Sequence, residues 1–402
     1  MCYIYRYSRG RAPQQIDAKD ECIMKAQYAP MGWNSWNTFG KDVNEQIVRE
    51  AADKIAETGL RDAGYEYIIV DDYWSEKQRD DAGRLVPNHE KFPHGMRALG
   101  DYIHQKGLKF GMYSCAGTNT CAGFPGSFEH EFADAETFAG YGVDYLKYDY
   151  CFHPASVPGS VLYKRMALAL RNCGRDIFFA ACNWGSEHSE QWMAESGADS
   201  FRSTGDIQDN WKSVKSRAQQ QVTGKTLPYG RPYCYNDLDM LVVGMKGKGN
   251  VALGGCTAEE YKTHFALWCM HSSPLIIGCD VRGMDGGTKE ILMNPELIAV
   301  DQDIEARPPF AFVDPAGIEY TATYLKCLHD GSYAVCFTNY SDAPVNLTLQ
   351  FFDIGLSDGC GYGLKFRDLW AHRDVGVYCG SFTCSKIAPH ACGVYKASVV
   401  KL

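Results

Sequence analysis

Val143-Asp144-Tyr145-Leu146-Lys147-Tyr148 is the stretch of sequence that decides the fold, because this short apolar run ends at an acidic residue, Asp149. Similar runs recur on both sides of it. Seven further candidate strands lie at 29–32, 67–70, 108–113, 177–181, 200–202, 239–242 and 274–277. Short apolar runs of this kind are typical of a parallel sheet that is buried on both faces.

Helical patterns lie between these runs. Residues 43–58 place apolar side chains at Val43, Ile47, Val48, Ala51 and Ile55 with a period near 3.6, and a glycine follows soon after as a stop signal. Further helices are expected at 97–106, 131–138, 161–171, 258–270 and 288–299. This alternation predicts an α/β fold, a (β/α)₈ TIM barrel, with a doubly wound open sheet as the alternative.

The pattern changes after Asp303, where Pro308-Pro309 interrupts the chain. Alternating strands follow at 320–325, 333–338 and 345–351, and an Asp330-Gly331 turn separates the first two. This pattern predicts a small all-β C-terminal antiparallel sandwich. We therefore expect three segments: an N-terminal extension at 1–24, a barrel at 25–303 and a β-sandwich domain at 304–402.

Composition excludes several classes of function. Of the 402 residues, 45% are hydrophobic, which is enough for a sizeable core, and 40 basic against 49 acidic residues give a net charge of −9. This balance argues against binding to nucleic acid or to an anionic membrane surface. We see no apolar run of the ~20 residues that a spanning helix needs.

Two further features bear on the compartment. The first residues show no apolar stretch followed by a small-residue cleavage site, so we expect a cytoplasmic location, with secretion left open. The 17 cysteines are scattered and lack C-x-x-C spacing. We interpret them as buried free thiols in a reducing compartment rather than as zinc ligands.

The candidate site lies at the ends of the predicted strands, because active-site groups of a (β/α)₈ barrel come from the carboxyl ends of its strands. These ends carry Trp33-Asn34-Ser35-Trp36, Asp71-Asp72-Tyr73-Trp74, Asp149-Tyr150-Cys151, Asn183-Trp184, Arg202-Ser203-Thr204-Gly205-Asp206 and Asp239-Met240. Carboxylates accept hydrogen bonds from sugar hydroxyls, and an indole face covers the apolar side of a pyranose. Two carboxylates can also supply a nucleophile and a general acid.

Each acidic residue also has a purely structural interpretation. An Asp at a strand end is often a helix N-cap, and this is the better interpretation of Asp42 and Asp209. The adjacent acids Asp71 and Asp72 are different, because they repel each other unless something binds them, so we assign them a functional role.

Lys147 lies two residues before Asp149, on the same face of the predicted strand. Such a pair can be a plain buried ion pair. At the mouth of a barrel, we interpret Lys147 as holding Asp149 ionised and contacting a substrate hydroxyl.

Six motifs together resemble glycoside hydrolase family 27, the family of retaining α-galactosidases and α-N-acetylgalactosaminidases. They are Met31-Gly32-Trp33-Asn34-Ser35-Trp36, Val70-Asp71-Asp72-Tyr73-Trp74, Gly123-Phe124-Pro125-Gly126-Ser127, Tyr145-Leu146-Lys147-Tyr148-Asp149, Arg202-Ser203-Thr204-Gly205-Asp206-Ile207 and Asp237-Leu238-Asp239-Met240. They occur in order over residues 28–300, and the β-rich tail resembles the C-terminal domain of the family.

The resemblance implies an exo-glycosidase that hydrolyses terminal α-D-galactosyl residues of small galactosides and oligosaccharides with retention. Asp149 matches the nucleophile, and Asp206 matches the acid/base, which must be protonated at the start. No metal and no organic cofactor are implied. Barrels of this kind often pair, which leaves a homodimer open.

The resemblance also implies a set of sugar contacts. Asp71 and Asp72 match the pair that binds the galactose hydroxyls at C4 and C6. The other expected substrate-binding residues are Trp36, Tyr113, Lys147, Cys151, Asn183, Trp184, Arg202, Asp239 and Met240. Cys121 and Cys151 match a disulfide that tethers the loop beside the nucleophile, and in a reducing compartment this bridge would be open.

Three positions depart from the family pattern. Asn183 replaces the Glu of a Cys-Glu-Trp motif, and Cys115 replaces the Asp of a Tyr-Ser-Asp-Ala-Gly motif. Ala198 stands where animal members place the partner of a second disulfide, so Cys182 is expected to be a free thiol. Asn183 lies in the region that reads the substituent at C2, where the bulky Trp184 favours galactose over N-acetylgalactosamine.

Several alternatives stay open at this point. β-L-arabinopyranosidase activity is disfavoured because both Asp71 and Asp72 are present to bind the C6 hydroxyl, and α-N-acetylgalactosaminidase activity comes next. A non-catalytic sugar-binding barrel is disfavoured because both catalytic acids are intact. A metal-dependent hydrolase is disfavoured because the histidines fall in predicted loops or helices, at His89, His94, His104 and His130.

Overall fold

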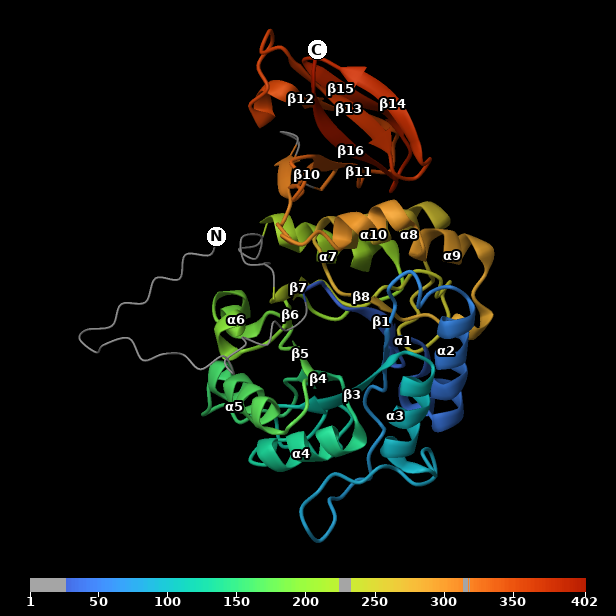
Figure 1. Cartoon of the computed structure of the whole chain (residues 1–402), viewed down its shortest axis with the longest axis vertical. Helices are drawn as coiled ribbons and strands as arrows, with labels where there is room; N and C mark the ends of the chain where they lie inside the picture. The colour runs from blue at the N-terminus through green and yellow to red at the C-terminus, as the bar shows by residue number, and fades with distance from the viewer. Residues whose placement is uncertain (1–26, 224–232, 314–316, 318) are drawn as a thin grey trace, which may run out of the picture.

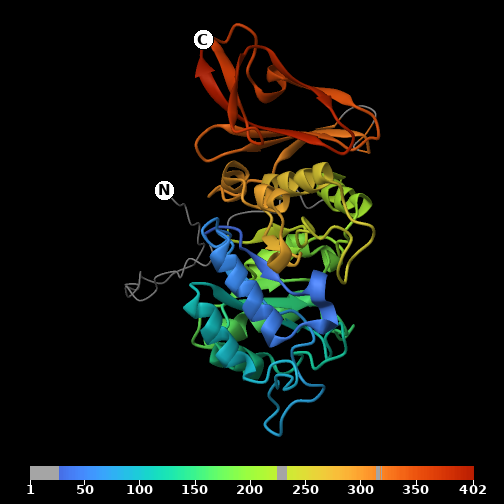
Figure 2. The same ribbon diagram turned by 90° about the vertical axis from the view of Figure 1, so that its right-hand side faces the viewer.

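The computed structural model describes residues 27–223, 233–313, 317 and 319–402. In this part of the chain, a curled sheet surrounded by helices is followed by a β-rich unit, which lies against the helices at one end of the molecule (Figures 1 and 2). The N-terminal extension expected at 1–24 lies outside the described residues.

The first sheet is a parallel barrel. Its eight described strands are β1 (Met31–Asn34), β2 (Tyr67–Ile69), β3 (Lys109–Cys115), β4 (Tyr145–Asp149), β5 (Phe178–Ala181), β6 (Ser200–Arg202), β7 (Tyr235–Asp237) and β8 (Leu275–Ile277). Neighbouring strands pair in parallel, β1 also pairs with β8, and a parallel bridge joins Leu241 to Ile277 after β7. The predicted (β/α)₈ barrel is confirmed, and the open-sheet alternative is wrong.

The bounds of two predicted strands need correction. The seventh strand is Tyr235–Asp237 and not 239–242, because Asp239 has a φ of +89°, which is incompatible with extended backbone. The first strand is Met31–Asn34, two residues later than predicted. With these corrections, Asn34 is the last residue of its strand, and Asp239 lies two residues beyond the end of its strand.

Helices surround the barrel. The helices in the described ranges are α1 (Trp36–Phe39), α2 (Glu45–Glu57), α3 (Gly95–Gln105), α4 (Glu131–Tyr141), α5 (Gly159–Asn172), α6 (Met193–Ser196), α7 (Trp211–Thr223), α8 (Ala258–Met270), α9 (Gly286–Leu292) and α10 (Pro295–Asp301). Short 3₁₀ helices lie at Gly40–Asp42, Ser186–Gln191, Val281–Gly283 and Phe351–Ile354. No described helix combines the length and the apolar character needed to cross a bilayer.

One expectation about the helices is wrong, and one long helix was not predicted. The predicted helix at 288–299 is two helices, because Asn294 caps α10 by accepting from the backbone N–H groups of Glu296 and Leu297, and Pro295 opens the new helix. Helix α7 has no counterpart among the predicted helices.

The two predicted N-caps are also corrected. The N-cap of α2 is Asn44, which accepts from Ile47 N at 3.0 Å, while Asp42 ends the preceding 3₁₀ helix. Asp209 is fully buried and accepts from Tyr261 Oη at 2.8 Å. It therefore connects two segments of the barrel instead of capping a helix.

The C-terminal unit is an antiparallel sandwich. Its described strands are β9 (Phe310–Val313), β10 (Thr321–Cys327), β11 (Tyr333–Asn339), β12 (Val345–Gln350), β13 (Tyr362–Asp368), β14 (Arg373–Tyr378), β15 (Ser381–Ile387) and β16 (Cys392–Lys401). They form a sheet in the order β14-β13-β16-β11-β10-β9 and a two-stranded sheet of β12 and β15. Phe366 and Phe382 stack between the sheets with ring centroids 3.9 Å apart, which confirms the predicted sandwich.

Candidate active site

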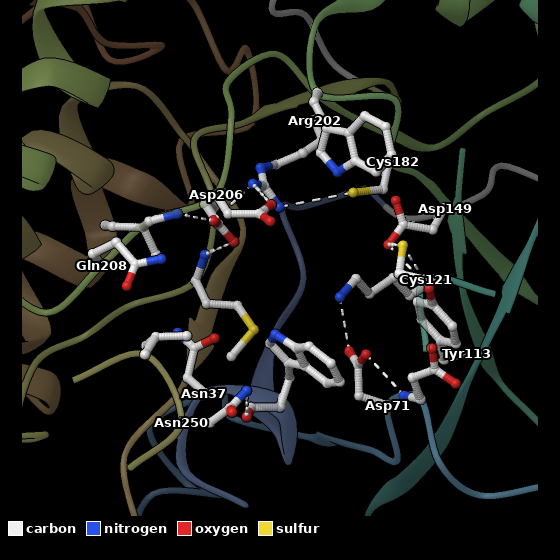
Figure 3. Close-up of a pocket in the computed structure, with 18 residues that line it drawn as sticks. Asn37, Asp71, Tyr113, Cys121, Asp149, Cys182, Arg202, Asp206, Gln208 and Asn250 are labelled. Atoms are coloured by element: carbon white, nitrogen blue, oxygen red, sulfur yellow. Dashed lines mark hydrogen bonds and ion pairs between the residues drawn. The ribbon is translucent and has the colours of Figure 1, made fainter. Parts of the chain in front are cut away.

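A cavity of about 270 Å³ opens at the carboxyl ends of the barrel strands (Figure 3). Eleven residues expected in the site line it: Trp36, Asp71, Asp72, Tyr113, Lys147, Asp149, Trp184, Arg202, Asp206, Asp239 and Met240. Asn37, Cys121, Cys182, Ile207, Gln208, Asn250 and Val251 line it as well. The strand ends thus bring acids from distant parts of the sequence into one cavity.

Asp149 is the last residue of β4 and is 6% exposed. One of its carboxylate oxygens accepts from Tyr150 N at 3.0 Å, and the other accepts from Tyr113 Oη at 3.1 Å. The same oxygen lies 3.6 Å from Cys121 Sγ. The carboxylate is therefore fixed by groups of β3, β4 and the loop beside them.

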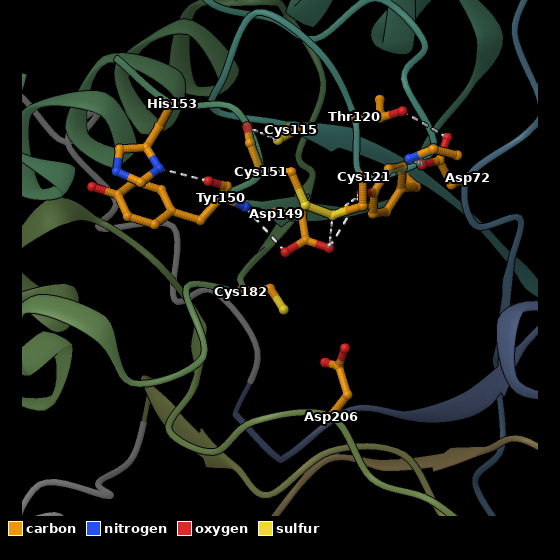
Figure 4. Close-up of a disulfide and its surroundings, with 12 residues drawn as sticks. Asp72, Cys115, Thr120, Cys121, Asp149, Tyr150, Cys151, His153, Cys182 and Asp206 are labelled. Carbon is orange, nitrogen blue, oxygen red and sulfur yellow. Dashed lines mark hydrogen bonds between the residues drawn. A yellow bond between two sulfur atoms is a disulfide. The ribbon is translucent and has the colours of Figure 1, made fainter. Parts of the chain in front are cut away.

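Asp206 lies in the loop that follows β6, four residues after Arg202. Its side chain is 69% exposed and forms an ion pair of 2.8 Å with Arg202 Nη2. Figure 4 shows the carboxyl groups of Asp149 and Asp206 pointing toward each other across open space. Two acids on opposite sides of one cavity are the arrangement that glycoside hydrolysis requires.

The surroundings push the pKa values of the two acids apart. Burial raises the pKa of Asp149 to about 6, although the charge of Lys147 opposes this rise. Partial desolvation by the surrounding protein acts to raise the pKa of Asp206, but the charge and the hydrogen bond of Arg202 outweigh this effect, so the pKa of Asp206 is lowered. The negative charge of Asp206 contributes to the raised pKa of Asp149.

These contacts bear on two expectations about charge. Lys147 was expected to hold Asp149 ionised, and its charge does act to lower the pKa of Asp149, but its ion pair of 2.8 Å is formed with Asp71 Oδ2. Asp206 was expected to be protonated at the start, but Arg202 favours its ionised form in this arrangement. The sequence indicated that Lys147 and Arg202 belong to the site. It did not show which of the nearby acids each of them contacts.

Asp71 and Asp72 are adjacent but are held by different parts of the protein. Asp71 accepts from Asn34 Nδ2 at 2.7 Å and from Lys147 Nζ at 2.8 Å, which are groups of β1 and β4. Asp72 accepts from Thr120 Oγ1 and from Ala122 N, both at 3.0 Å, in the loop after β3. Hydrogen bonds and one ion pair thus allow two neighbouring carboxyl groups to coexist in the buried wall of the cavity.

Arg202 also binds Asp239, whose Oδ2 lies 2.7 Å from Arg202 Nη2. Asp239 accepts from Ile207 N at 2.6 Å and from Met240 N at 2.7 Å, so it is fixed by the two loops that carry it and Asp206. Trp36 also lines the cavity, and its ring stacks on Tyr73 with centroids 6.2 Å apart. The cavity therefore combines charged groups with an indole wall.

The expected disulfide between Cys121 and Cys151 is present, with Cα atoms 5.1 Å apart (Figure 4). The interpretation of the cysteines as buried thiols is therefore wrong for this pair, and also for Cys360 and Cys379, which are exposed. Cys121, Asp149 and Cys151 place ligand atoms within 4.8 Å of one another. Because the two sulfurs share a disulfide, they do not offer thiolates to a metal ion.

Comparison with known proteins places this site in a family. The family model described as "Alpha galactosidase A" matches residues 28–303, and the model described as "Alpha galactosidase C-terminal beta sandwich domain" matches residues 319–397. The chain belongs to the α-galactosidase family, glycoside hydrolase family 27. It is a glycoside hydrolase.

Relatives agree with this assignment over most of the chain. The chain is 44% identical to an α-galactosidase of Cyamopsis tetragonoloba over 370 residues, which cover 92% of this chain and 86% of the relative. It is similar to the crystal structure of α-galactosidase I from Mortierella vinacea, with a TM-score of 0.85 and 34% identity over 93% of this chain and 97% of that one. An α-galactosidase from Saccharomyces cerevisiae, solved with raffinose, gives a TM-score of 0.81 and 27% identity over 93% of this chain and 98% of that one.

Positions where this chain departs from the family pattern lie beside the cavity. Asn183 is fully buried behind the wall, where its Nδ2 donates to Ser186 O at 2.8 Å, while Cys182 and Trp184 line the cavity. The expected role of Asn183 at C2 stays a prediction. Cys182 carries a free thiol, as expected, and its Sγ lies 3.7 Å from Arg202 Nη1.

Cys151 and Cys115 lie just outside the cavity. Cys151 reaches the cavity only through its disulfide partner Cys121, and its role as a sugar contact stays a prediction. Cys115 is buried, and its Sγ donates to Cys151 O at 3.0 Å. The Cys115 thiol therefore supports the segment that carries the disulfide.

Sequence reasoning missed Gln208, Asn250 and Val251 in the cavity wall. These residues come from the loops after β6 and β7, and their residue types occur throughout the chain. Gln208 follows the Arg202–Ile207 motif by one residue, which is the only signal that could have pointed to it.

Proposed function

We propose that this member of the α-galactosidase family is a retaining exo-glycosidase that hydrolyses terminal α-D-galactosyl residues of oligosaccharides and other galactosides. The observation that carries the proposal is the pair Asp149 and Asp206, which face each other across a small cavity lined by further acids and an indole. The yeast relative solved with raffinose supports an oligosaccharide as the substrate class.

The reaction has two steps. In the first, the Asp149 carboxylate attacks the anomeric carbon while the bond to the leaving oxygen breaks and Asp206 donates a proton to that oxygen. In the second, water attacks the anomeric carbon of the galactosyl-enzyme, Asp206 accepts a proton from this water, and Asp149 is released. The two inversions give net retention.

The charges around the site supply what each step needs. Above a pH of about 6 Asp149 is ionised and can act as a nucleophile. Asp206 needs a proton, and Arg202 has an alternative partner in Asp239. When the contact of Arg202 with Asp206 gives way to a sugar hydroxyl, the pKa of Asp206 rises toward that of a general acid.

The wall of the cavity selects the sugar. Asp71 and Asp72 accept hydrogen bonds from hydroxyls on one side of the ring, and Lys147, whose charge is balanced by Asp71, donates to a neighbouring hydroxyl. Trp36 covers the apolar face of the ring. Trp184 and Cys182 occupy the wall near Arg202 and leave less room for an acetamido group.

A panel of nitrophenyl glycosides tests the proposal. We expect kcat/KM for the α-galactoside to exceed that for the β-L-arabinopyranoside by at least about 100-fold, because polar groups built to bind the C6 hydroxyl are left unpaired by a sugar without it. The α-N-acetylgalactosaminide is also expected to react more slowly. A preference for either of these sugars would contradict the proposal. Because both steps use carboxyl groups alone, activity is expected to survive a metal chelator.

A further inference from the structure

The segment that holds Asp72 is a short loop at residues 116–126, which we call the bridged loop because Cys121 in its centre is joined to Cys151. It follows β3 and lies over the cavity, and Cys121 itself lines the cavity. Cys151 comes two residues after Asp149 at the end of β4. The disulfide therefore connects the bridged loop to the strand that carries the nucleophile.

Both residues that flank Cys121 bind Asp72, whose third donor is the neighbouring Tyr73 N at 2.8 Å. Thr120 Oγ1 donates to Asp72 Oδ1, and Ala122 N donates to Asp72 Oδ2, each at 3.0 Å. Figure 4 shows Thr120, Cys121 and Asp72 side by side. Each carboxylate oxygen of Asp72 thus takes one hydrogen bond from a position next to the bridged sulfur.

Two hydrogen bonds between Thr120 and Phe124 close the tip of the bridged loop. Thr120 N donates to Phe124 O at 2.8 Å, and Phe124 N donates back to Thr120 Oγ1 at 3.1 Å. The base of the loop is attached by a hydrogen bond of 3.2 Å from Thr118 N to Phe152 O. At its tip, a contact of 3.3 Å from Lys77 Nζ to Ala122 O is exposed. The Phe124 ring also packs against Tyr73 with ring centroids 5.2 Å apart, and Arg79 Nη2 donates to Gly126 O at 2.7 Å. To these noncovalent contacts the bond at Cys121 adds a covalent attachment of the tip to the barrel.

Asp71 provides an internal comparison, because its donors Asn34 and Lys147 belong to barrel strands. Because these strands are paired with their neighbours in the barrel, we expect Asp71 to keep its position when the disulfide opens. Asp72, by contrast, takes two of its three hydrogen bonds from the bridged loop, whose tip the disulfide holds. Opening the bridge should therefore affect one of the two neighbouring acids selectively.

We propose that the Cys121–Cys151 disulfide positions Asp72 for sugar binding through Thr120 and Ala122, so that reduction of the bridge weakens binding of the galactoside while both catalytic acids stay in place. The proposal rests on the proposed function and deepens it. Thr120 is a positioning residue, because it acts on the sugar through Asp72.

The redox step requires a two-electron reductant that reaches the exposed Cys121. With a water-soluble trialkylphosphine, phosphorus attacks one sulfur and the S–S bond breaks. Water then supplies the oxygen of the phosphine oxide and the protons of the two thiols. The protein gains two electrons and two protons, and the phosphine is oxidised to its oxide.

The first test compares steady-state kinetics on nitrophenyl α-galactoside before and after treatment with tris(2-carboxyethyl)phosphine. After treatment, a count of accessible thiols should show that two new thiols have formed. We then expect KM to rise about tenfold, as for the loss of hydrogen bonds to a charged group, while kcat changes about threefold or less. The double variant Cys121→Ser/Cys151→Ser should show the raised KM without reductant and no further response to it. Removing both sulfurs prevents a new bridge to Cys115.

The matched control is Cys360→Ser, which removes an exposed free thiol of the C-terminal unit and should respond to the phosphine as the unmodified protein does. An unchanged KM after two new thiols have appeared would overturn the proposal. So would a large fall in kcat at constant KM, because that result would assign the bridge to the nucleophile instead of Asp72.

A second test leaves the disulfide intact and does not depend on the folding of the cysteine variant. Thr120→Val removes the hydroxyl that binds Asp72 at nearly constant shape, and it should raise KM about tenfold with kcat unchanged. Thr120→Ser keeps the hydroxyl and should restore a KM near that of the unmodified protein. Equal KM values for the Val and Ser variants would contradict the role of Thr120.

The two proposals can fail separately. An oxidised, folded protein that hydrolyses no α-galactoside would overturn the proposed function itself. An active enzyme whose KM ignores both the reductant and the Thr120 variants would overturn only the positioning role of the disulfide.

Discussion

The end of β4 and the loop after β6 present the same side chain in opposite settings. Asp149, at the end of β4, is 6% exposed and is held by a backbone N–H and by Tyr113. Asp206 has a side chain that is 69% exposed and is held by one arginine. Burial raises the pKa of the first to about 6, and Arg202 lowers the pKa of the second.

This difference separates the two roles. A nucleophile must reach one carbon atom with little freedom, and a strand end buried in a barrel provides that rigidity. An acid/base must serve first the leaving oxygen and then water, and a loop with an exchangeable arginine contact allows its pKa to change between the two steps. We therefore expect substitutions of Asp149 and of Asp206 to affect catalysis differently.

The largest effect is expected for Asp149→Asn. Loss of the nucleophile should lower kcat for nitrophenyl α-galactoside by about 10⁴-fold or more, the loss typical for a residue that forms the covalent intermediate. Asp101→Asn, on the exposed face of α3, is the matched control and should retain full activity. Substantial turnover by Asp149→Asn would remove this residue as the nucleophile.

A smaller and selective effect is expected for Asp206→Ala. With raffinose, whose leaving group needs a proton, the rate should fall about 10³-fold, the usual contribution of general acid catalysis. With a dinitrophenyl α-galactoside, whose leaving group needs no proton, formation of the galactosyl-enzyme should fall much less. Equal losses for both substrates would contradict the assignment of the acid.

The pH dependence sharpens the comparison. Because Asp149 must be ionised, kcat/KM of the unmodified enzyme should fall as the pH drops through about 6. The charge of Asp206 raises the pKa of Asp149, so Asp206→Asn should move this acid limb to lower pH, measured with the dinitrophenyl substrate. A limb that stays in place would show that the two carboxyl groups do not interact.

The smallest effect is expected on stability. The pKa of Asp149 in the folded protein lies above the value of 3.8 for an ordinary Asp, so its folded form binds a proton more tightly, and its contribution to stability falls as the pH rises from about 4 to about 6. The Asp149→Asn substitution removes the ionisable group and therefore this decrease in stability at higher pH. We expect the variant to melt a few degrees higher than the unmodified protein at pH 7.5, with a free-energy gain of about 2–3 kcal/mol. The gain should disappear near pH 4, and a variant that is less stable at pH 7.5 would contradict the cost of burying this charge.

Much of the fold could be predicted from the sequence, because buried strands such as Tyr145–Asp149 and amphipathic helices such as Glu45–Glu57 leave clear patterns. The first and last residues of helices and strands were less predictable where a single backbone angle decides them. Asp239 looks like part of a strand in the sequence, and its positive φ places it beyond the strand. The division between α9 and α10 depends on the capping contacts of Asn294.

The candidate site shows the same division between pattern and geometry. The acids were predictable because each one follows an apolar strand, and parallel strands bring their carboxyl ends together. The ion-pair partner of each cation was not predictable from the sequence. Lys147 can reach Asp71 or Asp149, and the geometry of the barrel decides that it pairs with Asp71. Gln208 and Asn250 line the cavity from loops, and loop sequences have no repeating pattern from which their position could be predicted.

Trapping the covalent intermediate tests the central assignment most directly. With an activated 2-deoxy-2,2-difluoro-α-galactoside, the fluorines slow both steps and the good leaving group accelerates only the first, so the galactosyl-enzyme accumulates. The labelled enzyme can then be digested and the modified peptide identified by mass spectrometry. The prediction is a single difluorogalactosyl group on the peptide that contains Asp149, with no label on Asp149→Asn. Label on a different residue would contradict the account, as would formation of the β-anomer of galactose as the first product.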